Sequence, residues 1–356
     1  LIYGTFAIGG VLSPFISGVL ADRFFRLEHL LALSYGLGGL CMFACSYAQD
    51  FLTFYMLILL YQLCVAPSFG LSSSMVFHHV RDSQKEFPRI RVWGTVGWIA
   101  AGLLVGFLDI ESTAVPMRIS AMGALVACIY ALTLPATPPP GGKRPFQWRQ
   151  ALGLDALQAF RQPGLLILVV VLLLLSFPTA FYHSFANPFF NETGMQNAAG
   201  KMTLGQITEI GVMLSMPWLF ARVKIRYVLL AGIFIWALRY GLFSWGELHN
   251  SNWMFFLGIA LHGPAYSYTN LTAQILVDRL VPRSMRSSAQ GLMSLVTMGL
   301  GRLGGSFLAG SVVQYYALAG GRHQWPSIWA WPAGMALVVG MLYVLWLLRL
   351  HWKSRL

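Results

Sequence analysis

Charged side chains are scarce in this 356-residue sequence: Asp, Glu, Lys and Arg together make up 10% of it, whereas apolar residues make up 57%. The mean hydropathy of +0.64 lies far outside the range of soluble domains. So little charge leaves too few polar side chains to cover a surface that faces water, and a soluble globular domain is therefore excluded.

Cysteine and catalytic motifs are rare as well. The four cysteines fall within apolar stretches, with neither zinc-binding spacing nor a disulfide framework. They are Cys41, Cys45, Cys64 and Cys128. The sequence contains no Gly-x-Ser-x-Gly or His-Glu-x-x-His motif, and the nearest approach to a catalytic group is Ser72–Ser74 with His78 and His79. We therefore expect no metal, no cofactor and no enzymatic activity.

Long apolar runs are abundant instead. A helix needs about 20 apolar residues to cross a bilayer core, and we identify eleven such spans. They lie near 2–21, 29–48, 51–78, 91–108, 115–135, 165–186, 203–221, 227–246, 253–276, 287–314 and 327–348. The runs are continuous and lack the alternation of a membrane barrel. The sequence therefore predicts an all-α polytopic membrane protein.

The net charge of +12 is unevenly distributed along the chain. Nineteen of the 24 Lys and Arg residues lie in every second loop, whereas the opposite loops hold only Arg118, Lys201 and Arg322. This is the positive-inside pattern, which places the basic loops and the C-terminus in the cytoplasm. The charge therefore sets the topology, and we expect no nucleic-acid partner.

A short repeat divides the chain. Residues 21–33 (ADRFFRLEHLLAL) match residues 220–232 (FARVKIRYVLLAG) at an offset of 199 positions. We predict a first helical half at 1–135, a cytoplasmic loop with an amphipathic helix at 136–164, and a second half at 165–356. The offset pairs the first span with the seventh. We therefore expect one helix to be missing before Leu1, and we favour a truncated gene fragment over a genuine eleven-span protein.

Several motifs carry a resemblance to a known family. The loop Gly18-x-x-x-Asp22-Arg23-x-x-Arg26 resembles a signature of the major facilitator superfamily. The stretch FPRIRVWGTVGWIAAG at Phe87–Gly102 resembles the nucleoside:proton symporter family, as do NPFF, LHGPAY and RSSAQG further along. The likeness covers essentially the whole chain. It implies the major facilitator fold, with eleven of twelve expected transmembrane helices present in two pseudo-repeated halves.

Polar side chains at bilayer depth are costly, so their presence suggests a function. Arg91, Thr95 and Trp98 share one face of the fourth span and offer a donor fork, a hydroxyl and an aromatic plane to a nucleoside. Gln206 and Glu209 lie three residues apart in the seventh span. Glu209 is the only carboxylate well inside an apolar span, and we predict that it carries the proton. The resemblance places these residues in the family's substrate pocket. The alternative for Glu209 is a structural pair with Arg239.

Two histidines, His183 and His262, lie in later spans that would line the same cavity, with Tyr266 one turn after His262. Asn187-Pro188 and Gly263-Pro264 are expected to interrupt their helices. The sequence departs from the family at Ser267, where the family carries Asp. It also has Ala180 in place of a polar residue, and His183 in place of an amide.

The resemblance implies a secondary active transporter that imports nucleosides across the bacterial inner (plasma) membrane by proton symport with alternating access. Its expected partners are the nucleoside, protons and the lipid bilayer, and we expect a monomer. The departures keep other interpretations open: transport of a different small polar solute such as a sugar or drug-like compound, or a non-functional truncated transporter. Coupling to protons, coupling to sodium, and uncoupled transport also stay open.

Overall fold

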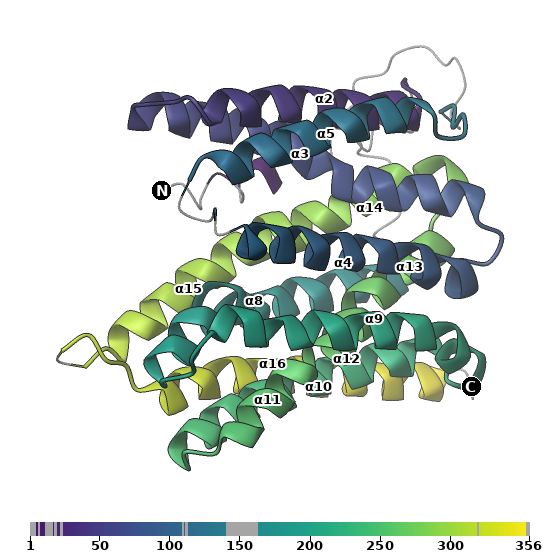
Figure 1. Cartoon of the computed structure of the whole chain (residues 1–356). Coiled ribbons are helices and arrows are strands. Elements are labelled where there is room, and N and C mark those ends of the chain that lie inside the picture. Colours follow the sequence, from purple (N-terminus) through teal and green to yellow (C-terminus); the bar gives the residue numbers. More distant parts are fainter. Residues whose placement is uncertain are drawn as a thin grey trace. The chain divides into compact units, whose positions relative to one another are not determined.

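The computed structural model describes residues 5, 8–10, 17, 20–21, 24–108, 110, 113–139, 163–318 and 320–353. Over this part the chain is almost entirely helical, as the sequence predicts (Figure 1). The α-helices are α2 (Leu27–Cys45), α3 (Phe51–His79), α4 (Ser83–Phe107), α5 (Val115–Leu132), α8 (Pro163–Glu192), α9 (Ala198–Arg222), α10 (Ile225–Leu248), α11 (Asn252–Ala260), α12 (His262–Tyr266), α13 (Thr272–Leu280), α14 (Arg286–Ser294), α15 (Arg302–Tyr315) and α16 (Trp325–Lys353). Two π-helical segments, Ser267–Leu271 and Leu295–Gly301, join α12 to α13 and α14 to α15.

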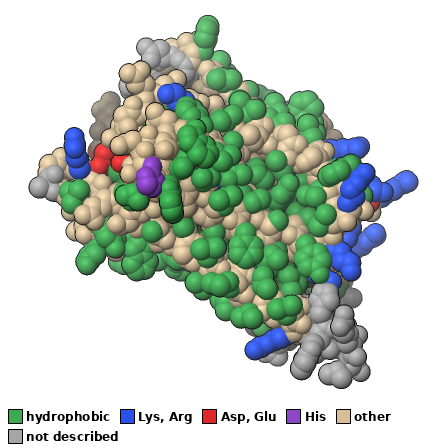
Figure 2. Space-filling model, turned by 90° about the horizontal axis from the view of Figure 1, so that it is seen from below, with side chains coloured by type: hydrophobic (Ala, Val, Ile, Leu, Met, Phe, Trp, Pro, Cys, Tyr) green, Lys and Arg blue, Asp and Glu red, His purple; other side chains and the backbone are tan. Residues whose placement is uncertain are grey.

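Every predicted span from 29–48 onward coincides with a helix or with a series of helical segments. Within the described residues, seven helices are long and apolar enough to cross a membrane. The helices α4 and α9 are not among them, and these two carry five of the predicted site residues: Arg91, Thr95, Trp98, Gln206 and Glu209. Figure 2 shows one face of the molecule, on which hydrophobic side chains predominate and several Lys and Arg side chains gather at one end.

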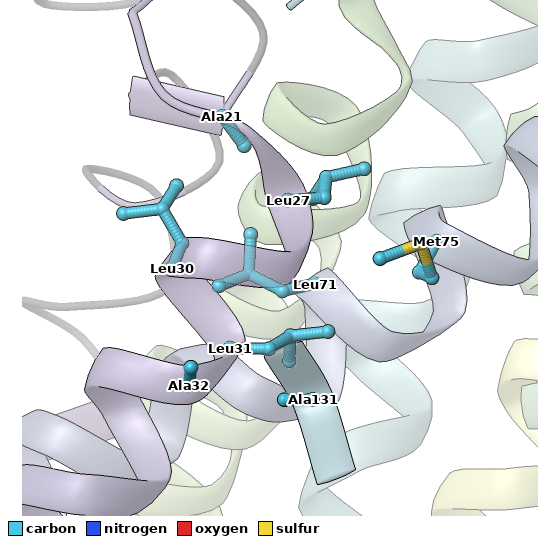
Figure 3. Packing of buried hydrophobic residues seen from close by; sticks show 8 residues of the cluster. All are labelled: Ala21, Leu27, Leu30, Leu31, Ala32, Leu71, Met75 and Ala131. Atoms are coloured by element: carbon cyan, nitrogen blue, oxygen red, sulfur yellow. The ribbon is translucent and has the colours of Figure 1, made fainter. Parts of the chain in front are cut away.

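The chain forms two compact units. The first contains Leu1–Ser83, Ala100–Val169 and Leu276–Leu300, and the second contains Gln84–Ile99, Val170–Ile275 and Gly301–Leu356. In the first unit α2 packs on α3 and α5. Figure 3 shows the core that this packing creates, with Leu27, Leu30 and Leu31 of α2 against side chains of α3 and α5. These apolar side chains fill the space between the three helices.

The second unit repeats this neighbour pattern. Here α10 packs on α16 and on the series of helical segments from α11 to the first π-helix. At the 199-residue offset, α10 corresponds to α2. The matching residues Leu30 and Leu229 are both buried. The packing therefore agrees with a duplicated helical arrangement. The proposed sequence boundaries of the two halves stay a prediction, because each unit draws helices from both.

Ion pairs and a side-chain hydrogen bond hold helix ends of the first unit. Arg26 forms an ion pair with Glu28, Nε to Oε1 at 2.6 Å, and the backbone N–H of Thr137 donates to the other Glu28 oxygen at 2.9 Å. Arg286 pairs with Asp278 at 2.8 Å. The remaining residues of the loop motif, Gly18, Asp22 and Arg23, lie outside the described residues, as does the predicted amphipathic helix.

The two proline motifs behave differently. At Gly263-Pro264 the helix is interrupted, as expected, because α11 ends at Ala260 and α12 begins at His262. The expectation for Asn187-Pro188 is wrong: α8 runs through Pro188 and ends at Glu192. Proline is tolerated inside membrane helices where neighbouring groups satisfy the freed carbonyl.

Candidate substrate and proton site

A buried hydrogen bond links α4 and α9, two of the helices that carry predicted site residues. Thr95 of α4 donates through Oγ1 to Oε1 of Glu209 on α9 at 3.0 Å. Thr95 is 6% exposed and Glu209 is 5% exposed. Both residues belong to the second unit. A carboxylate this deeply buried needs such a donor, because removal of its hydration is costly.

Arg91 and Tyr266 complete this cluster. Arg91 lies one turn before Thr95 on α4, where its guanidinium hydrogen-bonds to the Tyr266 side chain and acts electrostatically on Glu209. The site therefore combines a cation, a carboxyl group, a hydroxyl and an aromatic ring from three helical elements. A polar solute with a flat ring could meet all four.

A close approach of α9 and α12 holds Glu209 in place. A Cβ added to Gly263 would lie 2.5 Å from the backbone carbonyl carbon of Thr208, so only glycine fits there. Thr208 also donates through Oγ1 to the Ala260 carbonyl at 2.7 Å. Pro264 has no N–H and leaves that carbonyl without its usual helical donor. The glycine and the proline of LHGPAY thus determine where α9 sits.

A second cluster surrounds Arg239 of α10, which is fully buried. Its Nε donates to the Gly258 carbonyl at 2.6 Å, and its Nη1 lies 3.1 Å from Nδ1 of His262. Its guanidinium carbon lies 3.6 Å from the ring centroid of Tyr182. The sequence left open a structural pair between Glu209 and Arg239. The structure instead gives Arg239 other partners.

The structure does not bring every predicted residue into the cluster. Trp98 is 73% exposed, and Ser267 is fully buried at the start of a π-helix. His183 is exposed, and its ring meets the edge of Tyr182 at 5.8 Å. Gln206 has a buried Oε1 for which the described residues provide no hydrogen-bond partner. Such an atom is available to a solute.

An apolar groove of about 750 Å³ lies elsewhere in the second unit, between α8, α16 and the end of α15. It is lined by residues such as Leu174, Phe177, Trp331 and Met335. It contains none of the predicted site residues. Most of its lining side chains are apolar, so it is poorly suited to recognise the hydroxyls of a sugar-bearing solute.

The helical arrangement matches solved structures of membrane transporters and places the chain in the major facilitator superfamily. Solved structures agree: the proton:xylose symporter XylE, of that superfamily, matches with a TM-score of 0.72 at 13% identity, over 96% of this chain and 84% of XylE. The chain belongs to the nucleoside H⁺ symporter family, whose sequence model matches residues 1–351.

Individual relatives are similar over most of their length. YegT of Escherichia coli (strain K12), whose name assigns it provisionally to nucleoside transport, is 40% identical over 88% of this chain and 75% of its own. The xanthosine permease of the same organism is 29% identical over 92% of this chain and 82% of its own. A crystal structure of a point mutant of the nucleoside transporter NupG matches with a TM-score of 0.75 at 25% identity, over 96% of this chain and 89% of that protein.

Proposed function

We propose that this protein imports nucleosides across the bacterial inner membrane together with protons, and that the solute crosses chemically unchanged. The observation that carries the proposal is the buried Thr95–Glu209 hydrogen bond beside Arg91 and Tyr266, in a chain of the nucleoside H⁺ symporter family. Alternating access of this site to the two sides of the membrane would couple the two fluxes.

Each residue has a distinct role in this proposal. Glu209 takes up and releases the proton, since it is the carboxyl group at the centre of the cluster. Thr95 and Arg91 stabilise its ionised form by a hydrogen bond and by charge. Tyr266 offers an aromatic face and a hydroxyl to the base. Gln206 supplies a buried amide oxygen for a donor on the solute.

Glu209→Gln tests the coupling. The amide keeps the size and polarity of the side chain but cannot exchange a proton. In proteoliposomes with an imposed pH gradient, we expect loss of labelled uridine accumulation and retention of uridine exchange. Glu247→Gln, near the end of α10 and outside the cluster, is the matched control and should accumulate uridine as the unmodified protein does. Retained accumulation with Glu209→Gln would remove Glu209 as the coupling group.

The solute range is tested separately. Ser267 is neutral where the family carries Asp, and His183 stands in place of an amide, so the pocket is altered relative to the family pattern. Competition of labelled uridine uptake by other nucleosides, free bases and sugars measures which solutes bind. We expect nucleosides to compete more strongly than sugars. Equal competition by sugars would contradict the proposed solute class.

We also propose that the protein acts as a monomer, with its C-terminus in the cytoplasm. The clustering of Lys and Arg in alternate loops supports this orientation.

A further inference from the structure

Arg239 is a buried cation that forms no ion pair with a carboxylate among the described residues. Among the described residues, its polar contacts are the Gly258 carbonyl and His262, and its guanidinium carbon lies over three aromatic rings. The ring centroids of Tyr182, Trp236 and Phe243 lie 3.6, 5.2 and 5.4 Å away. Carbonyl and cation–π contacts compensate part of the lost hydration and fix the guanidinium in one position.

The contact with His262 has one chemical interpretation. A guanidinium has five N–H donors and no acceptor, so the Nδ1 atom 3.1 Å from Arg239 Nη1 must accept the hydrogen bond. Neutral imidazole carries one proton, which then resides on Nε2. A second proton on Nδ1 would point an N–H at an N–H and would place two cations side by side in a buried site.

The surrounding rings prevent His262 from turning away. It stacks on Tyr182 at 5.5 Å and 28°, and on Tyr266 at 5.7 Å and 22°. The Trp236 ring stands at 87° to the His262 ring, with 5.9 Å between the two centroids. These neighbouring rings hinder the rotation that would exchange the two nitrogens of His262.

Other charged and titratable groups face His262 and Tyr266 from the neighbouring helices. Arg239 faces His262 from α10. His183 of α8 also interacts electrostatically with the His262 ring. Glu209 of α9, Arg91 of α4 and Arg302 of α15 act on the adjacent Tyr266. The Arg239 guanidinium thus lies beside the His262 ring itself, whereas the other two guanidinium groups and the carboxyl group act at Tyr266.

We propose that Arg239 is a positioning residue that fixes His262 as a neutral ring with its proton on Nε2. His262 then serves as a fixed hydrogen-bond donor that recognises an acceptor atom of the solute, and it takes no part in proton coupling. The solute part of this inference rests on the proposed function. The tautomer part does not.

Nitrogen NMR of the full chain tests the tautomer without any solute. Protein labelled with ¹⁵N-histidine is measured in nanodiscs between pH 5.5 and 8, and the His262 signals are assigned by their loss in His262→Gln. We expect a protonated Nε2 and an unprotonated Nδ1 throughout this range. A proton on Nδ1, or a doubly protonated ring at pH 6, would overturn this proposal. The proposed nucleoside uptake would still stand, because the measurement involves no solute.

Arg239 variants test the cause. Arg239→Met removes the donor at similar length, and we expect the His262 ring to lose its single tautomer, so that signals of both neutral forms appear. Arg222→Met is the matched control, because Arg222 also lies over a tryptophan, 4.2 Å from the Trp218 centroid, and bonds a carbonyl, but it is exposed. It should leave the His262 signals unchanged. If Arg239→Met does not fold, Arg239→Lys, which keeps a donor and the charge, should preserve the single tautomer. Mixed tautomers in that variant would contradict the proposal.

Solute analogues test recognition. Replacement of one carbonyl of the base at a time by a group that cannot accept a hydrogen bond should reveal one analogue that binds about tenfold more weakly. In His262→Phe that analogue and the parent nucleoside should bind equally. An analogue penalty that persists in His262→Phe would assign recognition to another residue.

Discussion

Thr95 and Glu209 meet through one hydrogen bond, and the value of that bond depends on its surroundings. At this depth no bulk water can replace the hydroxyl of Thr95 as a donor to the Glu209 oxygen. A hydrogen bond to a charged group in such a place contributes about 1.5–3 kcal/mol. The threonine is therefore expected to matter to transport, although it is itself neutral.

Thr95→Val tests this bond. Valine has nearly the same shape but no donor, so the ionised form of Glu209 loses its hydroxyl partner. We expect proton-driven uridine accumulation to fall by about tenfold or more, whereas Thr95→Ser should retain most of it. Initial rates in proteoliposomes measure both variants. Accumulation by Thr95→Val at the rate of the unmodified protein would show that the bond is dispensable.

The sequence singles out individual residues of the candidate site where a polar group lies within an apolar span. Arg91, Thr95 and Glu209 are polar groups within apolar spans, and the structure brings them together. The pairing of Arg239 with His262 was not predicted, because an arginine and a histidine do not attract each other. Only the packing of α10 against α11 and α12 brings them together. Trp98 was predicted to share the face of Thr95. Positions three residues apart point about 60° apart around a helix, and Trp98 is exposed whereas Thr95 is buried.

At the scale of elements, the close approach of α9 and α12 determines the position of Glu209. The contact requires glycine at position 263, because a side chain there would meet the α9 backbone. It also uses the Ala260 carbonyl as the acceptor for Thr208. Since packed interiors transmit displacement, a small change at this contact is expected to reach the Thr95–Glu209 bond.

Gly263→Ala tests the approach. The added methyl must displace the α9 backbone at Thr208, and overpacking of this kind costs about 1–3 kcal/mol. We expect weaker uridine binding by calorimetry and a lower unfolding temperature, with helix content by circular dichroism retained. Gly241→Ala in α10, where a Cβ would meet nothing within 4 Å, is the control and should bind normally. Unchanged binding in both variants would mean that the spacing of α9 and α12 does not determine the site.

Hydropathy predicts the helices but not where they end. The fourth span was predicted from residue 91, whereas α4 begins at Ser83, because hydropathy records apolar depth and a helix can continue into polar loops. Likewise, Pro188 was expected to break α8, and the helix passes through it. The π-helical segments were not predicted at all, since no local sequence pattern identifies a turn with one extra residue.

At the scale of the whole molecule, the alternating basic loops predict a definite sidedness. In a background in which the four native cysteines are replaced by serine, we expect His249→Cys, between α10 and α11, to react with a membrane-impermeant maleimide in intact cells. Arg283→Cys, between α13 and α14, should react only after permeabilisation. The reverse labelling pattern would invert the proposed orientation and make the C-terminus external.

Both π-helical segments lie close to places where the chain passes from one compact unit to the other, at residues 275–276 and 300–301. A π turn holds one residue more than the α turn that it replaces. Deletion of a single residue from either segment would therefore restore regular winding and leave the later side chains on their present sides. A deletion within α10 would instead rotate everything after it by about 100°. Related chains one residue shorter are thus expected to carry their gap in one of these two segments.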